Sequence, residues 1–375
     1  MKVVFETDRR SETSYIVTSA LLDQAEVVEW RKRETAIVFD ACLEDHHPGL
    51  LAGLRAILSP KGVLPVEGGE GLKDFKSALK ILGFLSEIGF AKDGLVIAVG
   101  GGTVCDVVSL AATLFRRGVG LALVPTTLLS QIDAAVGGKN GVNFEGTKNL
   151  LGHFYHPEIV ICDTSFNRTL AKRDFIGGLA EAIKVLAVSD AMRFSRNFCD
   201  REFTLDAFSQ ESLSLLVKDA LSTKLSLLAD DVFERSSRRL LNYGHAFAHN
   251  FEEESHFALT HGEAVLIGMT VENAIAIELQ LASAEVDGLQ AIITSLFTPQ
   301  CRRYWIDRAN LPPILTKLRL ARRNCLNLVC VKTIGDAAII DDVDTEVILG
   351  AWDRSEGILM GKQQRALVAG NARSR

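Results

Sequence analysis

Alternation between short β-branched runs and helical patterns in the first half of the chain constrains the fold most. Strands are predicted at residues 36–40, 95–99 and 119–124. Residues 75–88 have helical periodicity behind the N-cap residue Asp74, and a second helix is predicted over 106–114. Strands that alternate with helices at this spacing form a parallel, doubly wound sheet. The sequence therefore predicts an N-terminal α/β domain with a parallel Rossmann-like sheet.

The pattern changes near residue 169, where long helical periodicity replaces the alternation. Helices are predicted at residues 175–188, 213–228, 238–252 and 262–281. We therefore expect two domains, an α/β domain over residues 1–168 and a mostly α-helical domain over residues 169–375. The polar tail from Gly361 has no periodicity and is expected to be loose.

Composition excludes several classes of protein. The 375 residues carry a net charge of −6 without a long basic run, which argues against a nucleic-acid partner. No stretch reaches the apolar length of a membrane span, and the N-terminus turns acidic at Glu6 and lacks a signal-peptide profile. The seven cysteines are scattered without a C-x-x-C motif, as in proteins of a reducing compartment. We expect a cytoplasmic protein.

Three glycines, Gly100, Gly101 and Gly102, directly follow the predicted strand at 95–99. Such a turn lets the backbone approach a pyrophosphate at the N-terminus of the next helix. Three glycines also form plain turns, and their spacing is not that of the G-x-G-x-x-G fingerprint. One helical turn further on, Asp106 can reach a nicotinamide or ribose, or else is a solvated carboxylate.

A further segment lies where doubly wound sheets bind ligands, at the carboxyl end of a strand. Thr126 and Thr127 follow the third predicted strand. Glu70 and Lys73 belong to a polar segment that either contacts ribose hydroxyls or is an ordinary loop. Together with the glycines, these residues favour a nucleotide site.

A loop rich in glycine, amide and lysine residues is predicted over residues 133–143, and a second Lys-Asn pair opens residues 148–154. Ammonium groups supply charge and amides supply directed donors, so Lys139, Lys148 and the asparagines that follow them can surround a phosphate. The alternative is a surface loop of ordinary turn residues. Two Lys-Asn pairs in one short window favour phosphate.

Histidines in the second half suggest a metal site. His245 and His249 are four residues apart on one helical face, and His261 opens the next apolar helix. Glu181 lies three residues before Lys184 and is either a ligand or a surface acid paired with that lysine. A catalytic zinc ion takes three such protein ligands and keeps one open position. Spacing leaves open which three residues ligate, although Glu263 points elsewhere on its helix and is excluded.

The motifs from about Glu70 to His261, taken in this order, resemble the dehydroquinate synthase family of sugar-phosphate cyclases. The resemblance implies an N-terminal NAD-binding α/β domain, a helical metal domain, an active site in the cleft between them and a homodimer. It implies zinc, cobalt or another divalent metal at Glu181, His245 and His261.

The same resemblance assigns the remaining site residues. It implies substrate-phosphate contacts by Lys139, Asn149, Lys184 and His249, with Arg117 reaching in from the neighbouring subunit. Further substrate contacts are implied at Asp133, Lys224, Arg238 and Asn242, where Arg238 faces the substrate carboxylate. NAD contacts are implied at Glu70, Lys73, Gly101, Gly102, Asp106, Thr126, Thr127 and Lys148.

The implied reaction converts 3-deoxy-arabino-heptulosonate 7-phosphate to 3-dehydroquinate with loss of phosphate, a step of the shikimate pathway to aromatic amino acids. One alternative is a cyclase of sedoheptulose 7-phosphate for cyclitol biosynthesis, and another is an NAD-dependent polyol or glycerol phosphate dehydrogenase. Three departures bear on the substrate: Asn140 replaces a usual threonine, His153 replaces a small residue, and an Asp-Lys-Lys segment near the C-terminus is not evident. Arg322-Arg323 or Lys332 are its candidate substitutes.

Overall fold

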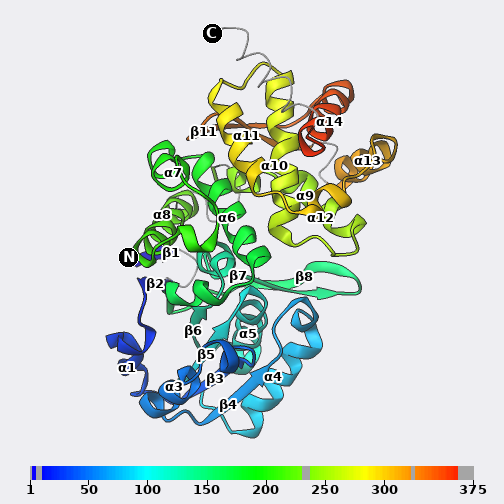
Figure 1. Ribbon diagram of the computed structural model, residues 1–375. Coiled ribbons are helices and arrows are strands. Elements are labelled where there is room, and N and C mark those ends of the chain that lie inside the picture. Colours follow the sequence, from blue (N-terminus) through cyan, green and yellow to red (C-terminus); the bar gives the residue numbers. More distant parts are fainter. Residues whose placement is uncertain (1, 6–10, 230–236, 322–325, 362–375) are drawn as a thin grey trace. The chain divides into compact units, whose positions relative to one another are not determined.

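The computed structural model describes residues 2–5, 11–229, 237–321 and 326–361 (Figure 1). Packing divides the chain into two compact units. Unit 1 comprises Met1–Ala171 and Phe208–Leu225, and unit 2 comprises Lys172–Ala207 and Ser226–Arg375. The predicted loose tail beyond Gly361 and the pair Arg322-Arg323 lie outside the described residues.

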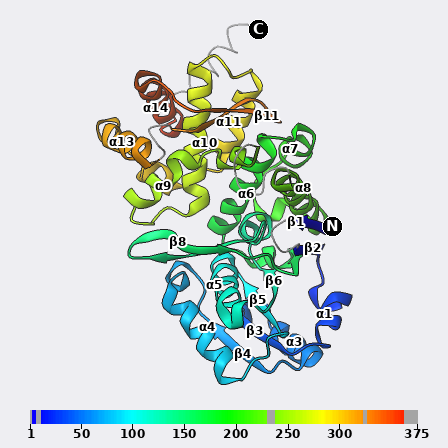
Figure 2. The same cartoon turned by 180° about the vertical axis from the view of Figure 1, so that it is seen from behind.

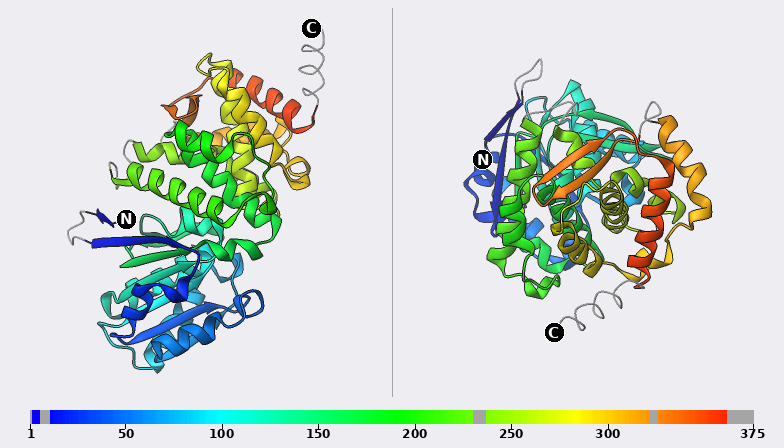
Figure 3. Two further views of the ribbon diagram at one scale, coloured as in Figure 1. Left: turned by 60° about the vertical axis from the view of Figure 1, so that its left-hand side comes forward. Right: turned by 90° about the horizontal axis from the view of Figure 1, so that it is seen from above.

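Unit 1 is built on a seven-stranded sheet with the order β1-β2-β9-β6-β5-β3-β4. β1 pairs with β2 in antiparallel fashion at one edge, and the other pairings are parallel (Figure 3). The strands are β1 Lys2–Phe5, β2 Ser11–Thr18, β3 Thr35–Asp40, β4 Gly62–Val66, β5 Leu95–Gly100, β6 Gly120–Pro125 and β9 Ile159–Asp163. The predicted strands at 36–40, 95–99 and 119–124 are confirmed as β3, β5 and β6.

Helices cover both faces of this sheet, which explains why β3 and β5 are buried along their whole length and read as continuous apolar runs. Side chains of α1 to α3 join Ile37, Phe39, Ile97 and Val99 in one apolar cluster. Figure 2 shows α4 and α5, which contact each other on the other side. The helices are α1 Ala25–Trp30, α2 Leu43–His46, α3 Leu50–Leu58, α4 Phe75–Glu87 and α5 Gly102–Leu114, with the 3₁₀ segments η1 Leu21–Asp23, η2 Glu70–Leu72, η3 Phe115–Arg117 and η5 Thr164–Thr169 and the π-helical turn η4 Ser130–Ala134. Asp74 caps α4 as predicted, by accepting the Ser77 N–H.

The direction of winding reverses between β3 and β5. The chain moves from β3 to its neighbour β4, then crosses back to β5 and on to β6. Ligands of doubly wound sheets bind at such a reversal, beyond the carboxyl ends of the strands. Those ends are Asp40, Gly100 and Pro125, and the last two are partners in the β5–β6 register.

The lysine- and amide-rich segment is a β-hairpin, so the prediction of a loop is wrong. β7 Lys139–Phe144 pairs with β8 Thr147–Phe154 in antiparallel fashion. The two connecting residues, Glu145 and Gly146, have φ values of 48° and 78°. Positive φ at both positions is the requirement of a type I′ hairpin turn, which holds the strands together.

Unit 2 is mostly helical, as predicted, and α10 is its central helix. α10 contacts α6, α9, α11, α12, α14 and β10, and its residues from Gly262 to Ala276 are buried (Figure 1). The elements are α6 Lys172–Ala187, α7 Ala191–Phe198, η6 Leu205–Ala207, η7 Ser237–Asn242, α9 His245–Glu254, α10 His261–Glu278, α11 Glu285–Ser295, α12 Pro299–Arg303, η8 Arg308–Asn310, α13 Leu311–Ala321, β10 Leu328–Thr333, β11 Asp336–Ile340 and α14 Thr345–Leu359. α8 Gln210–Ala229 has its first sixteen residues, to Leu225, in unit 1.

The predicted helix at 238–252 is wrong in its first turn. The chain forms the 3₁₀ segment η7 up to Asn242, turns at Gly244 with φ 80°, and only then begins α9 at His245. A left-handed residue of this kind interrupts a helix, and glycine adopts the conformation without strain. Among the described residues, no helix is both long and apolar enough to cross a membrane.

Candidate metal centre and nucleotide site

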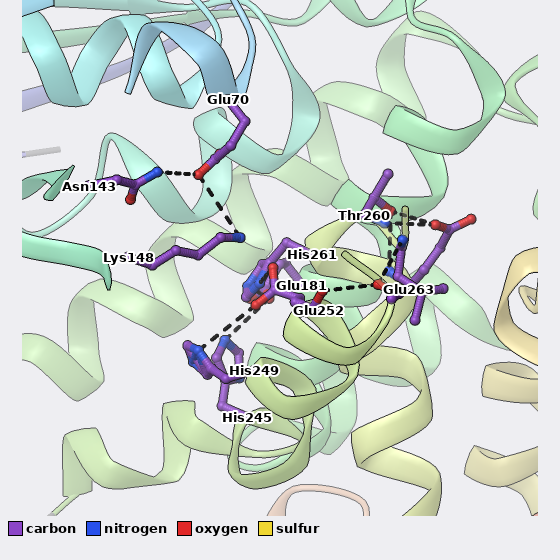
Figure 4. Close-up of polar contacts among 12 residues, drawn as sticks. Glu70, Asn143, Lys148, Glu181, His245, His249, Glu252, Thr260, His261 and Glu263 are labelled. Carbon is purple, nitrogen blue, oxygen red and sulfur yellow. Dashed lines mark hydrogen bonds and ion pairs between the residues drawn. The ribbon is translucent and has the colours of Figure 1, made fainter. Parts of the chain in front are cut away.

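Three potential metal ligands come together inside unit 2. Glu181 lies on α6, His245 is the first residue of α9 and His261 is the first residue of α10 (Figure 4). One ligand atom from each lies within 4.8 Å of the others. Glu181 Oε1 is 3.3 Å from His261 Nε2 and 3.7 Å from His245 Nε2. Two imidazoles that face a buried carboxylate fit the donor set that a divalent zinc ion prefers.

Backbone features of unit 2 set the positions of the two histidines. Glu272, fully buried on α10, accepts the Gly244 N–H at 3.0 Å and so fixes the turn directly before His245. His261 follows Thr260, which caps α10 in a reciprocal capping box with Glu263. Glu263 also binds Arg173 and Thr298. These contacts occupy both carboxylate oxygens of Glu263.

Burial and charge act on each member of the cluster. Glu181 is fully buried and forms an ion pair with the buried Lys184, so the alternative of a surface acid is wrong. Burial, together with the Lys184 charge, lowers the pKa of His245 to about 3. Burial also lowers the pKa of His261, but the carboxylates of Glu181 and Glu252 outweigh it and raise that pKa to about 9.

His249 lies beside the three-residue cluster. Its ring centre is 5.9 Å from that of His245 and 6.4 Å from that of His261, and its side chain is exposed. Glu252, which sequence reasoning did not single out, lies between two of these rings. The sequence does contain a pattern that indicates Glu252, because positions 245, 249 and 252 fall on one face of a helix.

In unit 1 the glycine turn leads directly into a helix N-terminus. Gly101 is the N-cap of α5, and the Thr126 N–H donates to the Gly100 carbonyl at 3.0 Å. A Cβ on Gly102 would lie 3.0 Å from the Ala134 Cβ. Thr127 binds Ser130 through both its N–H and its hydroxyl. These close approaches give the turn the form of an anion site at a helix N-terminus.

Asp106 and Lys73 form an ion pair of 2.6 Å near this turn, with side chains only 12% and 15% exposed. The alternative of a solvated carboxylate is therefore wrong. Burial raises the pKa of Asp106 to about 6, although the Lys73 ammonium opposes the shift. A mostly buried acid that titrates so near neutrality is a frequent mark of a functional site.

The hairpin and the polar segment at Glu70 are joined by Asn143 (Figure 4). Asn143 Nδ2 donates to Glu70 Oε1 at 2.7 Å, and its Oδ1 accepts the Asn149 N–H at 3.1 Å. Lys148 Nζ lies 4.0 Å from Glu70 Oε1. Asn143 was not among the expected site residues, because its contacts depend on the hairpin pairing and not on local spacing.

A second lysine–carboxylate pair lies elsewhere in unit 1. Lys224 Nζ donates to Asp133 Oδ1 at 2.7 Å and to the Asp133 carbonyl at 2.8 Å, and the lysine is buried. The structure thus brings together two expected substrate-binding residues that are 91 positions apart in the sequence.

The other expected site residues lie as follows. Lys139 is exposed, with Nζ 6.0 Å from the centre of the Phe154 ring, and Asn149 is exposed with φ 52°. Arg117 is exposed with φ 64°. Asn242 is half-buried at the end of η7, and the side chain of Arg238 lies outside the described part of the structure. The two sequence departures Asn140 and His153 are cross-strand partners, and Asn140 Oδ1 accepts the His153 N–H at 3.3 Å.

Comparison with known proteins covers most of the chain. The family model for the 3-dehydroquinate synthase N-terminal domain matches residues 63–177, and that for the C-terminal domain matches residues 178–312. The 3-dehydroquinate synthase of Campylobacter concisus is 35% identical over 81% of this chain and 86% of its own length. That of Xanthomonas oryzae pv. oryzae is 32% identical over 90% of this chain and 94% of its own.

Solved structures agree in fold. The 2-epi-5-epi-valiolone synthase of Streptomyces hygroscopicus, solved with NAD⁺ and Zn²⁺ bound, has a TM-score of 0.80 and 25% identity over 94% of this chain and 98% of its own. A 2-deoxy-scyllo-inosose synthase in complex with carbaglucose-6-phosphate, NAD⁺ and Co²⁺ has a TM-score of 0.78 at 22% identity, over 94% of this chain and 100% of its own. From its matched domains and its relatives, the chain belongs to the 3-dehydroquinate synthase family of carbon–oxygen lyases.

Proposed function

We propose that the protein is an NAD- and divalent-metal-dependent sugar-phosphate cyclase that converts 3-deoxy-arabino-heptulosonate 7-phosphate to 3-dehydroquinate and phosphate. The observation that carries the proposal is the buried cluster of Glu181, His245 and His261 with Lys184 beside it. Curated relatives of 32–35% identity, matched over most of their own length, are 3-dehydroquinate synthases and support this substrate.

NAD⁺ and a divalent metal ion would supply the parts of the chemistry that side chains lack. Bound NAD⁺ would supply a reversible hydride acceptor and the divalent ion a Lewis acid, so that a ring hydroxyl could be oxidised and later restored with no net redox change. Oxidation would make the neighbouring C–H acidic. A phosphate oxygen of the substrate would accept this proton, the C–H electron pair would form a C=C bond, and the electron pair of the carbon–oxygen bond would go to the phosphate. Phosphate leaves with that electron pair, and ring opening with aldol closure gives the carbocycle.

The chain's own residues would bind and orient the substrate. We assign Lys139, Asn149, Lys184 and His249 to the substrate phosphate, because cations and amide donors match its charge and geometry. Arg238 is assigned to the carboxylate, which a guanidinium can bind through two parallel hydrogen bonds. Lys224, already held by Asp133, is assigned to the substrate ring.

The nucleotide site is proposed to use the α5 N-terminus for the pyrophosphate and the Lys73–Asp106 pair for the nicotinamide ribose. Glu70, Lys148, Thr126 and Thr127 complete this set. The packing of Gly102 supports it, because a Cβ there would lie 3.0 Å from the Ala134 Cβ, so a close turn before α5 favours glycine.

A cyclase of sedoheptulose 7-phosphate is the second candidate. The departures Asn140 and His153, which pair across the hairpin, open the choice of substrate to it, and a 2-epi-5-epi-valiolone synthase of 25% identity shares the fold. The deciding experiment measures phosphate release by the purified protein with NAD⁺ and Zn²⁺, separately with each sugar phosphate. Release only with the heptulosonate, without accumulated NADH, supports the proposal. Release only with sedoheptulose 7-phosphate moves the chain to the second candidate, and NADH without phosphate indicates a dehydrogenase.

We further propose a homodimer in which Arg117 serves the site of the neighbouring subunit. Co-expressed Arg117→Ala and His245→Ala chains should then regain about a quarter of wild-type activity, because half of the dimers are mixed and each holds one intact site. Each variant alone should be nearly inactive. Absence of complementation in mixed dimers verified by differential tags would place Arg117 in its own subunit's site, and full activity of Arg117→Ala alone would place it outside any site.

A further inference from the structure

One carboxylate in unit 2 contacts the metal cluster without belonging to it. Glu252 lies on α9 and its side chain is only 3% exposed. Its Oε1 is 3.5 Å from His261 Nδ1 and its Oε2 is 3.9 Å from His249 Nδ1 (Figure 4). The three grouped ligand candidates among the described residues are Glu181, His245 and His261, so Glu252 sits one contact away from the cluster.

The two histidine ligand candidates are arranged alike. Each presents Nε2 to Glu181 Oε1 and turns Nδ1 to an oxygen acceptor on its other side. For His245 that acceptor is the Tyr243 carbonyl at 3.2 Å, a fixed part of the backbone. For His261 it is the Glu252 carboxylate at 3.5 Å. A neutral imidazole carries one N–H, so the acceptor that takes it decides which nitrogen keeps a lone pair for a metal.

We propose that Glu252 is a positioning residue, which holds the Nδ1–H of His261 so that Nε2 faces the metal position. The inference rests on the proposed metal site. Its physical basis is that a carboxylate behind a ligating imidazole fixes the ring orientation and makes the ligand more basic. Its second oxygen lies 3.9 Å from Nδ1 of His249, the exposed histidine assigned to the substrate phosphate.

Two variants separate the orienting role from simple loss of volume. Glu252→Ala removes the acceptor, whereas Glu252→Gln keeps an oxygen that can accept the Nδ1–H but removes the charge. Glu253→Gln is the matched control, because Glu253 is the next residue on α9 and forms an exposed ion pair with Lys317. Circular dichroism of each metal-free protein checks that the fold is retained.

The primary measurement is the zinc dissociation constant from competition with a chromogenic chelator. We expect Glu252→Ala to bind zinc about 10- to 100-fold more weakly, with a smaller loss for Glu252→Gln and none for Glu253→Gln. The second measurement is ¹⁵N NMR of the zinc-loaded wild-type protein, where His261 should show a protonated Nδ1 and a metal-bound Nε2. A purely structural role for Glu252 would not set this tautomer.

Each outcome bears on a separate claim. Wild-type zinc affinity in folded Glu252→Ala, or a His261 ring bound through Nδ1, overturns the role of Glu252 and leaves the metal site standing. Failure of the wild-type protein to bind zinc overturns the metal site and, with it, this inference. Weakened binding in Glu253→Gln as well would show a general effect of charge on α9 and would also overturn the assignment.

Discussion

Asp106 keeps a carboxyl group in a mostly buried position at the start of α5. Its pKa of about 6 lies above the ordinary value of 3.8 because burial disfavours the charged form more than Lys73 favours it. The folded chain therefore holds this proton up to higher pH than the unfolded chain does. The resulting stability is fully present below about pH 4 and is lost as the pH rises through about 6.

Asp106→Asn should remove this pH dependence. The free energy of unfolding of the variant is expected to equal that of the wild type near pH 4. Near pH 7 it should be larger by about 3 kcal/mol, since one pKa unit corresponds to about 1.4 kcal/mol. NAD⁺ affinity should fall, because Lys73 loses its partner and the ribose its acceptor. Urea unfolding at pH 4, 5, 6 and 7 tests the stability difference. If the difference in unfolding free energy between variant and wild type is the same at all four pH values, the pKa of Asp106 is not raised by folding.

His245→Ala should abolish both metal content and turnover while the chain stays folded. The residue begins α9 and contributes one of two imidazoles to the cluster, so its loss leaves two ligands where a catalytic zinc needs three. Atomic emission of the purified variant and its phosphate-release rate are the measurements. Full activity of the His245→Ala variant in a zinc-free preparation would contradict the metal assignment.

At the scale of elements, two glycines of α10 set how closely this helix approaches the turn before α9 and the helix α6 within unit 2. A Cβ on Gly268 would lie 1.9 Å from the Gly244 carbonyl oxygen, and one on Gly262 would lie 2.3 Å from the Gly177 Cα. Both neighbours are backbone and cannot rotate away. The turn before His245 and the start of α10 at His261 therefore depend on residues that have no side chain.

Gly268→Ala should destabilise unit 2 by about 3 kcal/mol or more, since backbone atoms would have to separate. It should also weaken metal binding, because the Gly244 turn carries His245. Gly288→Ala on α11 is the matched control: its Cβ would meet nothing within 4 Å, so the better helix former should stabilise by about 0.5–1 kcal/mol. Thermal unfolding of both variants gives the comparison. Similar melting temperatures would show that α9 and α10 can repack freely.

These elements also show what the sequence could predict. Short β-branched runs located β3, β5 and β6, and period-3.6 patterns located α4, α6 and α10, because both are local properties of the sequence. The hairpin was missed because glycine and asparagine break the alternation of β7 and β8, and pairing across the turn supplies what the local pattern lacks. The break at Gly244 was missed because it depends on Gly268, 24 positions away.

The residues of the candidate site likewise fall into those that the sequence predicted and those that only the tertiary structure revealed. Histidine spacing and the ordered motifs led to Glu181, His245 and His261, which the structure brings together. The contacts of Asn143 with Glu70 and of Glu272 with Gly244 join residues far apart in the sequence. No spacing rule predicts them, so they required the tertiary structure.

At the scale of the whole molecule, each unit carries a different half of the proposed chemistry. The metal candidates all lie in unit 2, and the expected NAD contacts all lie in unit 1. Hydrogen exchange should therefore slow in α6, α9 and α10 with Zn²⁺, and in β5, α5 and the hairpin with NAD⁺. At 100 times the dissociation constant the protection should approach about 2.7 kcal/mol. Protection of only one unit by both ligands would contradict this division.

Unit 1 is not a continuous piece of chain, since residues 172–207 belong to unit 2 and 208–225 return to unit 1. During synthesis on the ribosome, unit 1 could be completed only after residues 208–225, which carry Lys224, have emerged. This segment follows the last strand of the sheet by many residues. A gene broken after residue 171 would encode a sheet without that helix. Because both units are made of two segments each, no single cut in the gene separates the chain into its two compact units.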